Sequence, residues 1–168
     1  MLKKLKKTEL GIAENRSEVI NGLIKIAMSD LMVFWGTERE LVKRQEKLWL
    51  PIIKWLEDSV LRYKLSQTKD LNVPKQQGSL MGAFTSYLEK MSNKKLAAFY
   101  DASMTLQSMM IAAAFVEKKI TPEQAFDAAY IEEIWQNETW GTTDEALERQ
   151  NSIKSELKAL RDYLDESV

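Results

Sequence analysis

The sequence predicts an all-α protein, a single orthogonal or irregular bundle of about six helices. Only six glycines and three prolines occur in 168 residues, which leaves few places to break a helix. Apolar residues make up 45% of the chain and recur at helical spacing, whereas no segment alternates like a strand. The length suits one domain with its own core. We expect a basic, frayed segment over residues 1–12 and a helical domain over 13–168.

Two helices and a loop are expected in the first half of the chain. Apolar residues on a single face predict a helix over residues 13–35. Thr37 is placed to cap a second helix, with a glutamate at the capping-box position. That helix should extend to about residue 60, with a kink or a new start at Pro51, which has no amide hydrogen to donate. Acidic, amide and proline residues mark 66–76 as a loop.

The next predicted helices cover residues 77–91 and 94–118. Two glycines weaken the first of them. Ser92 or Asn93 can cap the second, whose apolar side chains extend nearly all the way round. The 94–118 helix is therefore expected to be the central and most buried one.

The last two helices have the clearest boundaries. Thr121 and Gln124 stand at the two positions of a capping box, with a proline between them at the first helical position. This helix should continue to about residue 139 and stop at Gly141. A final helix from about residue 142 or 143 to 165 has a narrow apolar stripe and a charged back.

Composition excludes several kinds of function. The chain has no cysteine and no histidine, so it lacks thiolate nucleophiles, zinc-finger ligands and the commonest general base. We therefore expect no enzyme, no metal site and no cofactor. A net charge of −1 argues against a dedicated nucleic-acid-binding protein.

Targeting and membrane signals are weak. The lysines within residues 1–7 are followed by no apolar stretch, as a secretory signal would require. The longest apolar run, from Met104 to Val116, is too short to span a bilayer. We expect a cytoplasmic bacterial protein without stable membrane insertion, since a mitochondrial presequence would be rich in arginine and poor in acids. The lysines within residues 1–7 also allow another interpretation, weak association with a membrane or RNA surface.

Glu132 is the most unusual acid in the sequence. Its neighbours three and four positions away are alanines, Trp135 and Gln136, so its carboxylate is expected on an apolar face. Such an acid needs a partner. The partner can be structural, as an ion pair or cap to another helix. Alternatively, Glu132 is exposed between Trp135 and Trp140 and binds a basic or amide group of another protein. Glu133 is expected on a mixed, wetter face.

Asp30 and the five tryptophans each allow two interpretations. Asp30 lies among apolar residues of the first predicted helix, which favours a structural acid with its hydrogen bonds satisfied. Tryptophans at helical spacing are more often core than interface, yet they are also typical of binding hot spots. Spacing alone does not separate the two.

A distinctive pattern lies near the C-terminus, in residues 131–141 together with Asp144, Glu145 and Ala146. It consists of two acids, any two residues, Gln, any three residues and Trp-Gly, followed by an acid and Ala. This pattern resembles the signature of the ATP-synthase assembly chaperones called the ATP-twelve family. Further matching blocks extend the resemblance over residues 15–165: Asp30-Leu31, Gln45, Trp49-Leu50-Pro51 with Trp55, Pro74 with Gln76, Ser108 to Ala114, Ile120-Thr121 and Glu123 to Phe126.

The resemblance implies a chaperone that binds the free alpha subunit of the ATP synthase catalytic head and prevents its aggregation until the beta subunit replaces the chaperone. The first acid of the signature, which matters most for function in the family, falls on Glu132. The implied partner-binding residues are Glu132, Glu133, Trp135, Gln136, Trp140, Asp144 and Glu145, with a secondary patch of Asp30, Gln45, Trp49 and Trp55. The main alternative is a helical interaction module with an unrelated partner.

Two features depart from the family. Members usually carry a β-rich N-terminal domain, for which 168 residues leave no room, so the sequence is either a fragment or a short member with the helical domain only. Family members have an acid before the proline, where this sequence has Leu50. They also have a basic residue after the block that begins at Asp30; this sequence lacks it and has Trp35 near that place.

Overall fold

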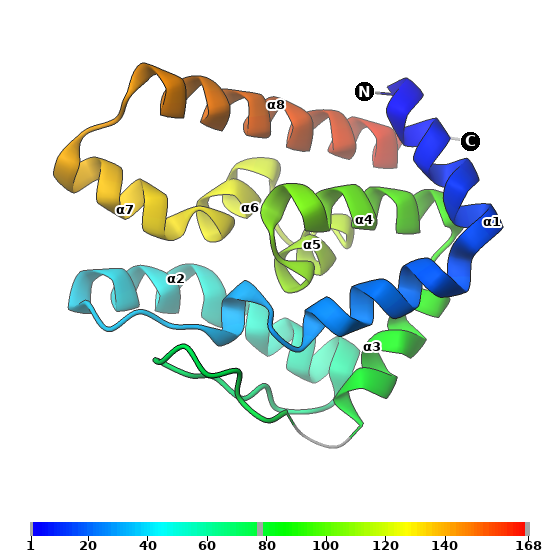
Figure 1. Cartoon of the computed structure of the whole chain (residues 1–168), viewed down its shortest axis with the longest axis horizontal. Helices are drawn as coiled ribbons and strands as arrows, with labels where there is room; N and C mark the ends of the chain where they lie inside the picture. Colours follow the sequence, from blue (N-terminus) through cyan, green and yellow to red (C-terminus); the bar gives the residue numbers. More distant parts are fainter. Residues whose placement is uncertain (1, 77–78, 167–168) are drawn as a thin grey trace.

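The computed structural model describes residues 2–76 and 79–166, which form eight α-helices, a 3-10 turn and a π-helical turn, with no β-strand (Figure 1). The predicted all-α class is confirmed. There are more than six helices because two of the predicted helices are each broken in the middle. The elements are α1 Leu2–Ala27, η1 Leu31–Val33, α2 Arg39–Trp55, η2 Leu56–Leu61, α3 Leu80–Glu89, α4 Asn93–Leu106, α5 Met109–Val116, α6 Pro122–Ala129, α7 Ile131–Trp140 and α8 Asp144–Asp165.

Helix α1 begins earlier and ends earlier than the sequence predicted. It starts at Leu2, and Leu5 and Ile12 are buried, so the expected start at residue 13 is wrong. The two apolar residues extend the buried stripe into the basic segment, whose lysines stay exposed. A kink at Asn15 (φ −129°, ψ 32°) separates the two halves of the helix. The helix stops at Ala27 instead of Trp35 because Asp30 starts a new turn.

Helix α2 lacks two expected features. Glu38, not Thr37, is its N-cap residue, and no side chain caps it. The helix also continues through Pro51 without a new start. Pro51 is exposed, so water can satisfy the carbonyl group that loses its donor. The departure from α geometry comes later, in the π turn η2.

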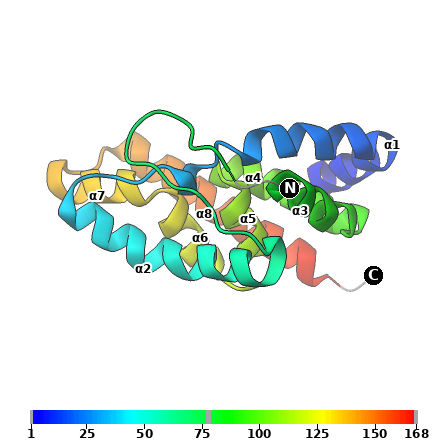
Figure 2. The ribbon, with the colours of Figure 1, turned by 90° about the horizontal axis from the view of Figure 1, so that it is seen from below.

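The loop expected over residues 66–76 is confirmed, and one side chain closes it. Gln76 accepts a hydrogen bond from the Ser66 amide (2.8 Å) and donates one to the Ser66 carbonyl (3.0 Å). Thr68 pairs with Phe34 in an isolated parallel bridge, so the loop runs beside the segment that follows η1 (Figure 2). Helix α3 follows, while positions 77 and 78 of the predicted 77–91 helix lie outside the described residues.

The long helix expected over residues 94–118 is two helices. Ser92, one of the two predicted candidates, caps the first by accepting from the Lys95 amide (3.1 Å). The chain then breaks at Gln107, whose φ of 54° is left-handed, and Ser108 caps α5. Every residue of α5 is buried, and α5 contacts α1, α2, α4 and α6, so the expected central position is confirmed for this part (Figure 1).

Asp30 joins α1, η1 and the start of α5. Its carboxylate accepts hydrogen bonds from the Ser108 hydroxyl (2.7 Å) and the Met109 amide (2.7 Å). It also accepts from the amides of Met32 (3.2 Å) and Met110 (3.3 Å). Burial raises the pKa of Asp30 from its ordinary 3.8, while these hydrogen bonds act in the opposite direction. The structure therefore supports the interpretation of Asp30 as a structural acid.

The C-terminal elements follow the predicted caps but contain one further break. The capping box of Thr121 and Gln124 is formed, with distances of 3.1 and 2.9 Å. The predicted helix to residue 139 is interrupted at Tyr130, whose hydroxyl donates to the Thr105 carbonyl (2.6 Å). Helix α7 ends before Gly141, and Thr143 caps α8, as expected.

We predict that Asp30→Ala lowers the free energy of unfolding by about 3 kcal/mol, because several buried donors lose their acceptor together. Urea unfolding followed by far-UV circular dichroism measures this change. Asp58→Ala is the matched control, since Asp58 is exposed, and it should change stability by less than about 0.5 kcal/mol. Equal stabilities of the two variants would contradict the central role of Asp30.

Candidate functional site

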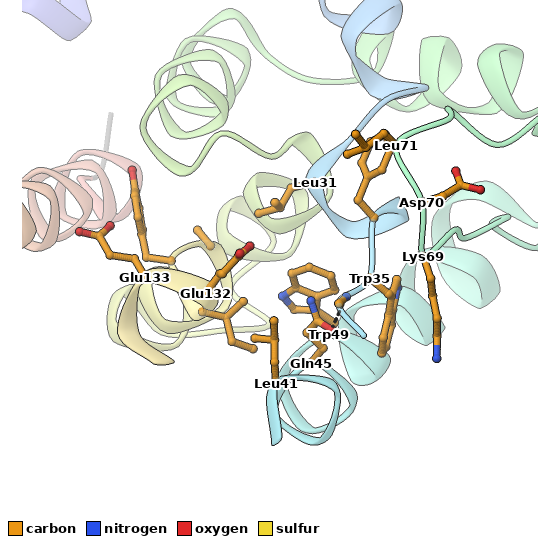
Figure 3. A pocket seen from close by; sticks show the side chains of 15 residues that line it. Leu31, Trp35, Leu41, Gln45, Trp49, Lys69, Asp70, Leu71, Glu132 and Glu133 are labelled. Atoms are coloured by element: carbon orange, nitrogen blue, oxygen red, sulfur yellow. Dashed lines mark hydrogen bonds between the residues drawn. The ribbon is translucent and has the colours of Figure 1, made fainter. Parts of the chain in front are cut away.

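A pocket of about 430 Å³ opens where four segments meet: the stretch after α1, helix α2, the loop before α3, and the junction of α6 with α7 (Figure 3). We call it the Glu132 pocket. It is lined by Leu31, Phe34, Trp35, Gly36, Leu41, Gln45, Trp49, Lys69, Asp70, Leu71, Ala129, Tyr130, Ile131, Glu132 and Glu133. Its wall is mainly apolar and aromatic, and its charges belong to residues at the rim.

The floor of the pocket depends on Gly36 and Gln45. The Gly36 amide donates to Gln45 Oε1 (3.0 Å), which holds the extended chain against α2. A Cβ at Gly36 would come within 2.6 Å of Leu41 Cδ2, so a glycine is needed for this close approach. Because Oε1 must face a backbone donor, the amide nitrogen of Gln45 faces the pocket (Figure 3).

Trp35 and Trp49 form the aromatic side of the pocket. Their rings meet edge to face, with centroids 5.5 Å apart and an interplanar angle of 87°. Each indole N–H is held by a backbone carbonyl: Trp35 donates to Met32 (3.1 Å) and Trp49 donates to Ala128 (2.8 Å). These two hydrogen bonds hold both indole rings in a defined orientation in the unbound protein.

The two neighbouring acids of α7 lie in different surroundings, opposite to the prediction. Glu132 is exposed, and it makes no ion pair or hydrogen bond with any residue within 2–76 and 79–166. Its carboxylate points across the pocket mouth towards Leu31 (Figure 3). Glu133 is half-buried, points the other way, and pairs with Arg149 of α8. The structural ion pair that the sequence allowed for Glu132 is therefore made by Glu133.

The structure gathers only part of the predicted site. Glu132, Glu133, Gln45 and Trp49 line the pocket together. Trp35 and Trp49 accompany Glu132 there, instead of the expected Trp135 and Trp140, because neighbours from other elements decide its surroundings.

The other predicted residues lie outside the pocket. Trp135 and Trp55 are half-buried against the core. Trp140 is 85% exposed, and Gln136, Asp144 and Glu145 are exposed near the turn between α7 and α8. Asp30 is buried and lines a separate cavity of about 250 Å³, away from the Glu132 pocket, so its place in a secondary binding patch stays a prediction.

Sequence reasoning missed several pocket residues. The predicted helix boundaries assign no packing role to Gly36, although a glycine between a tryptophan and a polar residue can indicate close backbone contact. Leu71 is 97% exposed at the pocket rim, and an apolar residue in a polar loop was the available signal. Tyr130 was placed inside a continuous helix, and no local pattern indicated its break.

Within the described ranges, no group of three or more acidic side chains is placed to hold a metal ion. In the same part of the chain, every helix is too short or too polar to cross a bilayer.

No protein-family model matches the sequence. The structure is similar to that of Atp12 from Paracoccus denitrificans, with a TM-score of 0.84 and 21% sequence identity over 92% of this chain and 66% of that one. It is also similar to a protein from Agrobacterium tumefaciens with a provisional chaperone assignment, with a TM-score of 0.80 and 28% identity over 92% of this chain and 58% of that one. The fold expected from the sequence resemblance is thus confirmed.

We predict that Gly36→Ala destabilises the protein by about 1–2 kcal/mol, because the new Cβ displaces the buried Leu41. Gly22→Ala is the control: Gly22 lies within α1 with open space around its Cα, so this change should stabilise by about 0.5–1 kcal/mol. Thermal and urea unfolding measure both effects. The same sign for both variants would show that close packing at Gly36 has no energetic consequence.

Proposed function

We propose that this chain is an assembly chaperone that binds the free alpha subunit of the ATP synthase catalytic head and prevents its aggregation before incorporation. The main support is the shared fold with Atp12, which extends over 92% of this chain. We propose no catalytic step for this protein, and we propose that it works in the bacterial cytoplasm.

The surface of the chain suits this work. An assembly surface on a free subunit is apolar and exposed, and masking it requires shape complementarity and apolar area. The Glu132 pocket offers an apolar recess with the carboxylate of Glu132 at its mouth. Trp140 offers a second apolar contact at the turn between α7 and α8, next to the exposed acids Asp144 and Glu145. We propose that the client contacts both.

Glu132→Lys is expected to weaken the complex with the alpha subunit by at least about tenfold, since it reverses the charge at the pocket mouth. The two proteins are co-expressed, and the complex is measured by size-exclusion chromatography with light scattering. Glu18→Lys carries the same charge change on an exposed part of α1 and should bind like the natural sequence.

The same experiment separates the alternatives. Absence of a one-to-one complex, together with unchanged aggregation of the alpha subunit, would overturn the proposal in favour of an unrelated partner. Loss of helical content in Glu132→Lys would show instead that Glu132 has a structural role.

Trp140→Ala tests the second contact. We expect about tenfold weaker binding to the alpha subunit, because exposed tryptophans are typical hot-spot residues. Its unfolding free energy should change by less than about 0.5 kcal/mol, since the side chain is 85% exposed. Trp135→Ala, which removes a half-buried ring, should lose stability. Unchanged binding by Trp140→Ala would exclude the turn from the interface.

A further inference from the structure

We infer that the Glu132 pocket binds an arginine side chain of the client, together with a backbone carbonyl group of the same client segment. This inference rests on the proposed function and specifies the chemistry that the client must present. Three independent features of the pocket support it: the charge at its mouth, its aromatic wall and an unused hydrogen-bond donor on its floor.

The charge at the mouth selects a cation. Glu132 is the acid directed across the opening, and it has no partner within the described part of the chain. Glu133 is neutralised by Arg149. Lys69 and Asp70 lie on the rim with side chains directed away from Glu132 (Figure 3). An occupant of the pocket therefore meets one uncompensated negative charge.

The aromatic wall favours arginine over lysine. A guanidinium group is planar and weakly hydrated, so it can stack on an indole face while donating two hydrogen bonds to a carboxylate. Trp35 is half-buried and its indole N–H is bound to the Met32 carbonyl, so its ring loses little side-chain freedom when a cation stacks on it. The aliphatic part of the arginine side chain fits the apolar surface of Leu31 and Leu41.

The floor provides a donor that a guanidinium group cannot use. Gln45 is 3% exposed, and its oxygen already accepts from Gly36. Among the described residues nothing accepts from its amide nitrogen, which faces the pocket. This nitrogen is not one of the buried side-chain atoms that lack a partner among the described residues, so it is accessible from the pocket. An occupant that displaces its water without offering an acceptor leaves the donor unsatisfied, and a guanidinium group offers no acceptor. A carbonyl oxygen from the main chain beside the arginine would satisfy it.

The test uses N-acetyl-arginine-N-methylamide, which carries both groups, and the full ¹⁵N-labelled chain. Titration followed by NMR should shift the side-chain amide of Gln45 and the indole N–H of Trp35 in a saturable manner, with a dissociation constant on the order of 1 mM. The norleucine analogue, which has no charge, should bind about tenfold more weakly. Glu132→Gln should weaken binding of the arginine probe by a similar factor, and Glu18→Gln should not.

Two results would overturn the inference. One is the absence of saturable shifts at the pocket, and the other is equal binding of the arginine and norleucine probes. If the alpha subunit still forms its complex in either case, the proposed function stands and only the arginine site is lost. Saturable arginine binding without any alpha-subunit complex would instead overturn the proposed client.

Discussion

The buried carboxylate of Asp30 is the interaction on which the candidate site depends. It caps the η1 turn just after α1, and it accepts hydrogen bonds from the Ser108 hydroxyl and from the first amides of α5. Because η1 is fixed there, the chain leaves it in a defined direction, and Trp35 can bond both Met32 and Thr68. The next residue, Gly36, then reaches Gln45 on α2. The wall of the Glu132 pocket is therefore set by a polar contact deep in the core.

This arrangement explains why the pocket can be rigid although much of it is loop. Irregular segments usually hold binding residues less firmly than helices do. Here the loop before α3 is closed on itself by Gln76 and Ser66, and it is joined to the 33–35 segment through Thr68. Both tryptophans have their indole N–H groups bound. A preorganised site loses less conformational entropy when a partner binds.

Helix boundaries could be predicted from the sequence where the contacts that determine them are local. The capping box of Thr121 with Gln124 and the cap at Ser92 lie within one turn of the helices they start, so the first was predicted correctly and Ser92 was one of the two predicted candidates for the second. The break at Ser108 was not predictable in this way, because the group that stabilises it, Asp30, is 78 residues away. Glu132 illustrates the same limit: its own helix suggested Trp135 as its neighbour, whereas the fold brings Trp35 and Trp49.

The contrast between Glu132 and Glu133 bears on how the proposed complex would form and later dissociate. Glu133 is paired with Arg149 and links α7 to α8. Glu132 makes no such pair with any residue that the structure describes, so its charge is available to a partner without a cost to the fold. A carboxylate at the pocket mouth remains solvated when the client is absent, and its pairing with a client cation adds selectivity and only modest affinity. In the proposed complex, a competing subunit that buries a larger apolar interface would displace this chain, because one ion pair at the pocket mouth adds only modestly to the affinity.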